Sequence, residues 1–126
     1  MKKKIALIAH DTRKMDMAEW ANFNKEKLSE YDLVGTSGTA NVIKNIAGLE
    51  VATLGHGPDG GDIYIAKEIL DGTIDKVIFL IDVRTPQGHE VDIQALIRTC
   101  VLHNIPLALN RKTADLMFIG FNKTVG

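Results

Sequence analysis

The sequence has little cysteine, little net charge and no long apolar run, and each shortage excludes a class of protein. A single cysteine among 126 residues, Cys100, excludes an intrachain disulfide and is typical of a reducing, cytoplasmic compartment. Fifteen basic and sixteen acidic side chains give a net charge of −1, which argues against nucleic-acid and anionic-membrane partners. No stretch approaches the roughly 20 apolar residues that a membrane span needs.

The sequence also lacks the short motifs of nucleotide-binding and metal-binding proteins. It has neither the GxGxxG pattern of a dinucleotide site nor the lysine-bearing Walker loop. Metal binding is only weakly indicated by the sequence. Common metal ligands are present at His10, Asp11, His56 and His89, but no close pair of them has a recognised ligand spacing.

Short apolar runs alternate with segments in which apolar residues recur at helical spacing. The runs predict strands over residues 5–9, 32–35, 51–54, 76–81 and 106–109. The spacing predicts helices over residues 15–28, 40–47, 63–70 and 91–103, with a last helix from Thr113. Strands that alternate with helices favour a parallel sheet covered on both faces. We therefore expect one α/β domain over residues 1–126, with a doubly wound, five-stranded parallel sheet and helices on both faces.

Polar side chains follow the expected strands at the points where the strands end. Open α/β sheets bind ligands at the carboxyl ends of their strands, so these side chains should share one rim. The rim residues are His10, Asp11 and Lys14 after the first strand, Thr36, Ser37, Gly38 and Thr39 after the second, and Asp82, Arg84, His89, Glu90 and Asp92 after the fourth. Hydroxyl groups and glycine at a strand-to-helix turn suit an anion.

The third expected strand is followed by a turn with four glycines in the eight residues 55–62. Glycine permits positive φ and lets another group approach the backbone, while Pro58 stiffens the turn. The turn ends at Asp62, at the start of the next helix, where an aspartate often serves only as a cap. The glycines favour a small ligand that lies on exposed amides beside a carboxylate.

Each rim residue also has a purely structural interpretation. A histidine that closes a strand often only bonds a loop, and Lys14 taken alone is a solvated helix residue. Thr39 and Asp92 occupy positions where a side chain commonly caps a helix. The functional hypothesis therefore rests on the shared rim and on no single member.

Three segments of the chain resemble the methylglyoxal synthase family. They are Ile5-Ala6-Leu7-Ile8-Ala9-His10-Asp11, Gly57-Pro58-Asp59-Gly60-Gly61-Asp62, and His89-Glu90-Val91-Asp92 with Ala95-Leu96-Ile97-Arg98. The similarity runs in order from about Ile5 to Asp115. It implies a lyase that converts dihydroxyacetone phosphate to methylglyoxal, with inorganic phosphate as product or inhibitor and without a metal or organic cofactor. It also implies a flavodoxin-like α/β fold assembled as a homohexamer.

The resemblance implies a role for each rim residue. Asp62 corresponds to the base that removes a proton beside the substrate carbonyl, His89 to the group that polarises the carbonyl, and His10 to a substrate-binding group. A carboxylate can serve as such a base in a dry, preorganised site. The implied phosphate grip consists of Lys14, Thr36, Ser37, Gly38, Thr39, His56 and Gly57. The carboxylates that correspond to supporting groups, which orient the histidines, are Asp11, Asp82 and Asp92.

The chain departs from the family pattern in the phosphate grip. The family usually has Thr-Gly-Thr-Thr-Gly where this chain has Thr36-Ser37-Gly38-Thr39-Ala40, which changes the position that can take positive φ. His56 replaces a serine, and Asp59 adds a negative charge beside the expected phosphate. A phosphate dianion needs cations as well as amides. We therefore expect Arg84, on the loop after the fourth strand, to reach the phosphate end of a site.

Two other kinds of function stay open from the sequence. An effector-binding module, as in the allosteric domain of carbamoyl phosphate synthetases, would use the same rim without chemistry. An interaction protein with a vestigial pocket would share only the fold, because fold alone does not fix function. Retention of Asp62, His89 and Asp92 favours the enzyme, and the altered phosphate grip favours the module.

Overall fold

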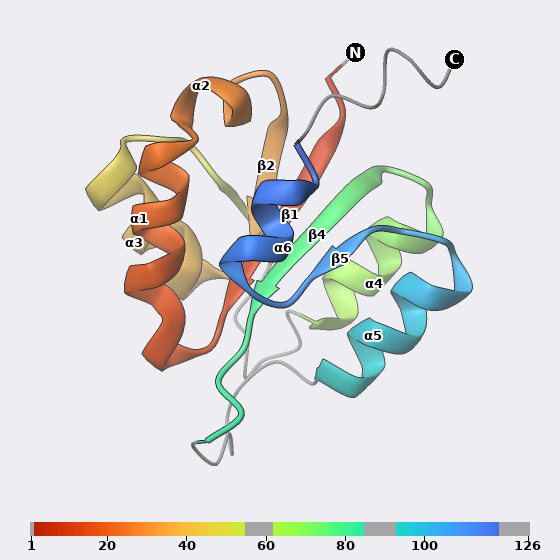
Figure 1. The fold of residues 1–126 in the computed structure, drawn as a ribbon. Helices are drawn as coiled ribbons and strands as arrows, with labels where there is room; N and C mark the ends of the chain where they lie inside the picture. Colours follow the sequence, from red (N-terminus) through yellow and green to blue (C-terminus); the bar gives the residue numbers. More distant parts are fainter. Residues whose placement is uncertain (1, 55–61, 85–92, 119–126) are drawn as a thin grey trace.

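The computed structural model of the chain describes residues 2–54, 62–84 and 93–118 (Figure 1). The strands are β1 (Lys4–Ala9), β2 (Asp32–Gly35), β3 (Ala52–Thr53), β4 (Ile74–Leu80) and β5 (Leu107–Ala108). The helices are α1 (Lys14–Phe23), α2 (Lys25–Leu28), α3 (Ser37–Ala47), α4 (Asp62–Leu70), α5 (Ile93–Leu102) and α6 (Arg111–Leu116). A short 3-10 turn, η1 (Asp11–Arg13), connects β1 to α1.

The strands form one parallel sheet of five, in the order β3-β2-β1-β4-β5. The central strand β1 pairs with β2, where Ala6 lies opposite Val34, and with β4, where Ala6 lies opposite Val77. The chain builds outward from β1 to β3 and then crosses to the other side for β4 and β5, so the switch point lies between β1 and β4. This confirms the doubly wound fold class. Flavodoxin has the same doubly wound architecture, but its strands are in the order 2-1-3-4-5.

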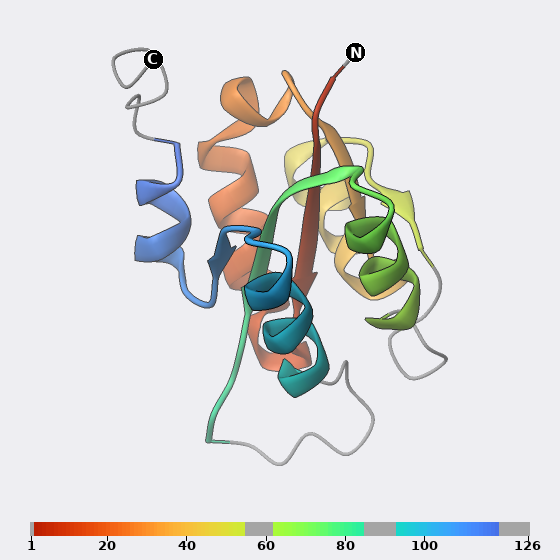
Figure 2. The same ribbon diagram turned by 90° about the vertical axis from the view of Figure 1, so that its right-hand side faces the viewer.

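Helices cover both faces of the sheet, and the alternation of side chains along β1 shows why. Ile5 and Leu7 pack into one apolar cluster with α1, α2, α3 and α6. Ala6 and Ile8 pack into the other with α4 and α5. In Figure 2, α4 and α5 lie in front of the sheet and α1 lies behind it. Because each strand residue faces one layer or the other, a central strand must be apolar along its whole length. That requirement produces the continuous apolar run in the sequence.

The expected helix over residues 15–28 is divided into α1 and α2 at Asn24. Asn24 leaves helical geometry, with φ −107° and ψ 23°. Its backbone amide donates to the carbonyl oxygen of Trp20 at 3.0 Å, and its side-chain amide donates to the same oxygen at 2.9 Å. Asparagine side chains that bond nearby backbone compete with the helix in this way. The prediction of one continuous helix was wrong at this point.

Two other helices begin earlier than the sequence predicts. α3 begins at Ser37 and not at Ala40, so the hydroxyl and glycine residues after β2 belong to its first turn. α6 begins at Arg111 and not at Thr113, because the Asn110 side chain caps the helix by accepting from the Thr113 amide at 2.9 Å.

Cys100 packs inside the fold. It is 1% exposed and lies on α5 in the cluster formed with α4. Burial raises the pKa of its thiol to about 11. The thiol therefore stays protonated and unreactive at neutral pH.

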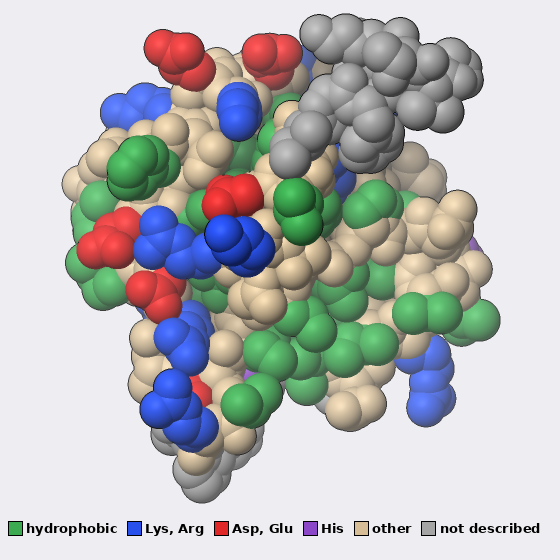
Figure 3. Space-filling view, in the orientation of Figure 1, with side chains coloured by type: hydrophobic (Ala, Val, Ile, Leu, Met, Phe, Trp, Pro, Cys, Tyr) green, Lys and Arg blue, Asp and Glu red, His purple; other side chains and the backbone are tan. Residues whose placement is uncertain are grey.

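The surface carries both an apolar and a charged region. Hydrophobic side chains gather over β5 and α5 in Figure 3, and Val101 and Leu102 of α5 are each 73% exposed. Acidic and basic side chains alternate over α1 and α6 on the same face (Figure 3). No helix in the described parts of the chain is long and apolar enough to cross a membrane.

Glu68, near the end of α4, connects this helix to the start of β1 and to the turn before β4. Its Oε1 accepts from Lys4 Nζ at 2.8 Å and from Thr73 Oγ1 at 2.9 Å. The hydrogen bond from Lys4 and, to a smaller extent, the one from Thr73 hold the pKa of the carboxyl below its ordinary 4.5.

We predict that this carboxylate stabilises the fold only where it is ionised. Because its pKa is lower in the folded chain, the contribution is full above about pH 4.5 and is lost as pH falls through the folded pKa. Glu68→Gln should lower the free energy of unfolding by at most about 1 kcal/mol at neutral pH, since solvent screens the pair, and by less at about pH 3. Urea unfolding at both pH values measures the difference, and an equal loss at both would contradict it.

Candidate active site

The buried polar side chains of the described chain gather at the carboxyl ends of the strands. They are His10, Thr36, Thr39 and Asp82, which are 4, 5, 0 and 8% exposed. His10 follows β1, Thr36 follows β2, and Asp82 lies just beyond β4. Doubly wound sheets bind ligands at this edge, beside the switch point. Polar groups are costly to bury, so their concentration here marks a candidate site.

His10 is held by the ends of the two central strands. Its backbone amide continues the sheet by donating to the Leu80 carbonyl at 3.1 Å. Its ring lies edge-on to Phe79, with 5.1 Å between ring centroids. Ring atom Nδ1 accepts from the backbone amide of Asp82 at 2.9 Å. Because that amide can only donate, the neutral ring carries its proton on Nε2.

The Nε2–H group of His10 is buried and has no hydrogen-bond partner within the described chain. A buried donor without an acceptor is unfavourable by about 1–3 kcal/mol, and such groups in folded proteins call for an explanation. The ring is otherwise fixed by its Asp82 bond and its Phe79 contact. An oxygen of a bound ligand would satisfy this donor.

The Asp82 carboxylate organises the segment that leaves β4. Its Oδ2 accepts from Thr12 Oγ1 at 2.5 Å, and its Oδ1 accepts from the Arg84 amide at 2.8 Å. The first bond reaches η1 and the second folds the following residues back on the carboxylate. Asp82 therefore fixes the relative position of the loops after β1 and β4.

The first turn of α3 lies beside the end of β1. Thr39 Oγ1 accepts from the Ala9 amide at 3.2 Å, and Thr36 Oγ1 donates to Thr39 Oγ1 at 3.3 Å. Thr36 is the N-cap residue, and its hydroxyl caps no amide of the described helix. The hydroxyls thus bind the helix start to the sheet, and the positive end of the helix dipole faces the rim.

Lys14 brings a positive charge to this helix start. A Cβ atom built on Gly38 would lie 2.6 Å from Lys14 Nζ, so the ammonium group packs directly on the glycine. Lys14 Nζ also lies 2.5 Å from Asp11 Oδ1. A lysine and a helix amino terminus together form an environment that suits a phosphate or carboxylate.

The structure brings together the predicted residues that it describes around the ends of β1, β2 and β4. These are His10, Asp11, Lys14, Thr36, Ser37, Gly38, Thr39 and Asp82. The Arg84 side chain is exposed, and the backbone amide of Arg84 bonds Asp82. Of Asp62, the structure describes the backbone as the first residue of α4. The other predicted site residues lie outside the described residues: His56, Gly57, His89 and Asp92.

Two residues that contact the site were not selected from the sequence. Thr12 bonds the Asp82 carboxylate, and Arg13 Nε donates to the Ile81 carbonyl oxygen at 3.2 Å. Their only sequence signal is their place between Asp11 and Lys14. No group of three or more potential metal ligands occurs among the residues that the structure describes.

Comparison with known proteins gives the family. A family model described as an MGS-like domain matches residues 16–109. The chain is 47% identical over 118 residues to methylglyoxal synthase of Ralstonia nicotianae, which covers 94% of this chain and 87% of that one. It is also 47% identical to methylglyoxal synthase of Clostridium botulinum strain Alaska E43 over 118 residues, which make up 94% of this chain and 99% of that protein. The chain belongs to the methylglyoxal synthase family.

The fold of this family member agrees with a solved relative. The crystal structure of methylglyoxal synthase from Elizabethkingia anophelis matches with a TM-score of 0.91 at 38% identity, over 95% of this chain and 79% of that chain. An uncharacterized protein of Synechocystis is 45% identical over 124 residues, which make up 98% of this chain but 29% of that protein. A domain of this kind therefore also occurs within a longer chain.

We predict that Gly38→Ala displaces the Lys14 ammonium group. The added methyl would lie 2.6 Å from Nζ and 3.1 Å from Cε, so the flexible lysine must move. The helix should keep its stability or gain up to about 1 kcal/mol. Binding of inorganic phosphate should weaken by about tenfold, measured by titration calorimetry.

Asn41→Ala is the matched control for Gly38→Ala, because Asn41 is an exposed residue of the same helix. It should leave phosphate affinity unchanged. If Gly38→Ala binds phosphate as well as the parent protein does, the Lys14 ammonium group on Gly38 has no part in an anion site.

Proposed function

We propose that this chain is a lyase that converts dihydroxyacetone phosphate to methylglyoxal and inorganic phosphate. The observation that carries the proposal is the His10 ring, which is buried at the switch point with Nδ1 bonded and Nε2–H free of partners in the described chain. A substrate oxygen would accept from Nε2 and remove the cost of the buried donor. The names of relatives that are 47% identical over 94% of the chain support this reaction.

The proposed reaction starts with proton removal from the carbon beside the substrate carbonyl. Asp62 accepts the proton, and the electron pair of the C–H bond moves toward the carbonyl oxygen to give an enediolate. His89 polarises this oxygen, and preorganised donors stabilise the charge that develops on it. The hydroxyl oxygen on the deprotonated carbon then forms a carbonyl as its proton passes to the phosphate oxygen, and the carbon–oxygen bond to phosphate breaks, so that phosphate leaves with the bonding electrons. The remaining enolate takes up a proton at its terminal carbon, equivalent to the one that Asp62 removed, and becomes methylglyoxal. No step needs a metal or an organic cofactor.

The His10 tautomer suits this chemistry. A neutral ring that donates from Nε2 can bond a substrate oxygen in both the ground state and the enediolate. Its other nitrogen is occupied by the Asp82 amide, so the ring cannot present an acceptor to the substrate without breaking that bond. His10 thus acts as a fixed donor in the proposed site.

The phosphate end of the proposed site lies at the first turn of α3. Lys14 supplies the cation there, packed on Gly38, and the helix amino terminus supplies a partial positive charge. The remaining members of the proposed grip are Thr36, Ser37, Thr39, His56 and Gly57. The same groups stabilise phosphate as it leaves, because its charge grows when the carbon–oxygen bond breaks.

The supporting carboxylates have different proposed tasks. Asp82 holds the loops after β1 and β4 through its bonds to Thr12 and Arg84. Asp11 pairs with Lys14 at 2.5 Å and so directs the ammonium group. Asp92 precedes α5 in the sequence and is proposed to orient His89.

We also propose a cytoplasmic homo-oligomer, a hexamer by family resemblance, with one domain over residues 1–126. Exposed apolar side chains on α5 support assembly, since Val101 and Leu102 are each 73% exposed. The single, buried Cys100 fits a reducing compartment.

The alternative is an effector-binding module that uses the same rim without chemistry. The Synechocystis relative favours it, because the matching domain is only 29% of that longer protein. The altered phosphate grip at Ser37 and Gly38 also favours the effector-binding module. Release of methylglyoxal and phosphate from dihydroxyacetone phosphate, assayed with the purified chain, separates the enzyme from the module.

We predict that Asp62→Asn lowers kcat by about a thousandfold while the protein still binds phosphate, because an amide cannot accept the proton. Asp71→Asn is the matched control, since Asp71 is an exposed aspartate just after the same helix, paired with Lys67. It should keep the parent rate. A rate for Asp62→Asn above about a tenth of the parent's would mean that the base lies elsewhere.

We predict that Arg84→Ala raises the inhibition constant of inorganic phosphate by at least about tenfold, which corresponds to one charged contact of about 1.4 kcal/mol. In this proposal the Arg84 guanidinium contacts the phosphate end of its own subunit's site or of a neighbouring subunit's site. Arg98→Ala, at an exposed position of α5, is the control and should have no effect. An unchanged constant for Arg84→Ala would exclude the contact.

A further inference from the structure

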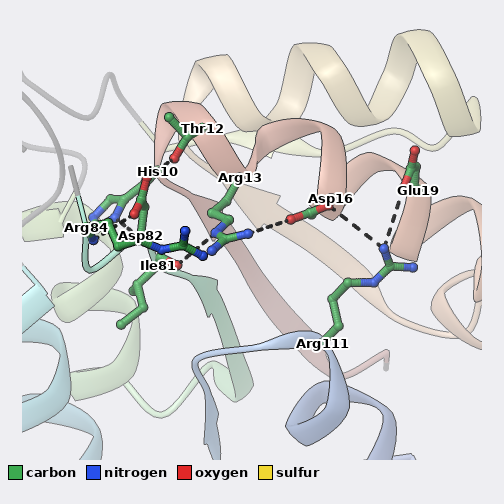
Figure 4. A network of polar contacts seen from close by, with 9 residues as sticks. All are labelled: His10, Thr12, Arg13, Asp16, Glu19, Ile81, Asp82, Arg84 and Arg111. Carbon is green, nitrogen blue, oxygen red and sulfur yellow. Dashed lines mark hydrogen bonds and ion pairs between the residues drawn. The ribbon is translucent and has the colours of Figure 1, made fainter.

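One peptide group, between Ile81 and Asp82, is hydrogen-bonded at both ends (Figure 4). Its carbonyl oxygen, on Ile81, accepts from Arg13 Nε at 3.2 Å. Its N–H group, on Asp82, donates to His10 Nδ1 at 2.9 Å. A continuous path of polar contacts therefore runs from the Arg13 guanidinium through one peptide plane to the His10 ring.

The charge on Arg13 strengthens this path. A guanidinium stays protonated at any pH that a folded protein tolerates, and its hydrogen bonds to oxygen are stronger than those of a neutral donor. A cation on the carbonyl oxygen draws electrons from the peptide group and makes its N–H a better donor. Coupled hydrogen bonds strengthen one another by roughly 10–30% each. The better donor favours the His10 tautomer whose Nδ1 is free to accept.

Arg13 is itself held in place from two directions. Its backbone amide donates to the His10 carbonyl oxygen at 2.8 Å, and its NH1 donates to Asp16 Oδ2 at 3.1 Å. Arg111 NH1 lies 4.0 Å from the other Asp16 oxygen and 3.5 Å from Glu19 Oε1 (Figure 4). These ion pairs are partly exposed, so solvent screens them and they add little stability. The Asp16 hydrogen bond holds the far end of the guanidinium while Nε meets Ile81, and the longer Arg111 contacts do not touch Arg13 itself.

We infer that Arg13 is a positioning residue for His10: by bonding the Ile81 carbonyl it polarises the Ile81–Asp82 peptide and holds the His10 proton on Nε2. Arg13 acts through the peptide group and needs no contact with substrate. The inferred link between Arg13 and the His10 tautomer rests on geometry alone. The effect of Arg13 on turnover rests on the proposed function.

Two substitutions distinguish the effect of losing the Nε–H donor of Arg13 from the effect of changing its side-chain volume. Arg13→Gln places a neutral N–H donor the same number of bonds from the backbone as Nε, and Arg13→Met has a similar length but no donor. Arg111→Met is the matched control, because it removes a second arginine that lies near Asp16 and does not contact the Ile81–Asp82 peptide. Both positions are partly exposed, so the three variants should fold.

The first readout is nuclear magnetic resonance of the full chain labelled with nitrogen-15. The His10 ring signals are identified as those lost in His10→Gln. In the parent protein, Nδ1 should show the shift of an unprotonated nitrogen and Nε2 that of a protonated one. Arg13→Met should move both toward the values of a tautomer mixture and shift the Asp82 amide proton upfield. Arg13→Gln should restore most of the parent pattern, and Arg111→Met should keep it.

The second readout is turnover of dihydroxyacetone phosphate. Arg13→Met should lower kcat/KM by about tenfold, Arg13→Gln by clearly less, and Arg111→Met should not change it. Unchanged His10 and Asp82 signals in Arg13→Met would overturn the inference, and so would an equal disturbance of those signals in Arg111→Met. If the parent protein shows no turnover, the proposed function fails, and the resonance signals still decide the role of Arg13.

Discussion

The hydrogen bond from the Asp82 amide to His10 Nδ1 joins the loops that leave the two central strands, and the candidate site depends on it. β1 and β4 run in register up to Ala9 and Leu80, and the His10 amide extends the pairing by one more bond. The ring can reach the Asp82 amide only because the sheet has already aligned these two strand ends. The site therefore takes its rigidity from the most buried part of the fold, which suits a group that must hold a proton at one fixed atom.

Much of the fold follows from the sequence because burial on both faces leaves a clear pattern. The apolar runs at residues 5–9 and 76–81 mark the central strands, and their parallel alternation with helices places the polar residues after them on one rim. This reasoning suffices to bring His10, Thr36 and Asp82 together. It fails at Asn24, where a side-chain bond to Trp20 ends a helix that the apolar spacing continues.

The contacts that give the site its chemistry could not be predicted in the same way. The bonds of His10 and Thr12 to Asp82, and of Arg13 to Ile81, join residues 72, 70 and 68 positions apart. Apolar periodicity assigns a residue to a face of the sheet, but it does not set the rotamer of a polar side chain or the peptide that it meets. The packing of Lys14 on Gly38 is of the same kind, because it depends on how the start of α1 lies against α3.

The two ends of the candidate site come from different parts of the sheet, so a change in the proposed phosphate grip is compatible with an unchanged His10 donor. The proposed anion end lies where β2 passes into α3, with Lys14 packed on Gly38 at the helix start. The donor end is built between β1 and β4, where His10 is bonded by the Asp82 amide. Substitutions in the first turn of α3 alter the space around the ammonium group, but they do not touch the Ile81–Asp82 peptide. Variation at the proposed anion end can therefore change which phosphorylated ligand would bind there, while the proton on His10 Nε2 is still fixed by the Asp82 amide.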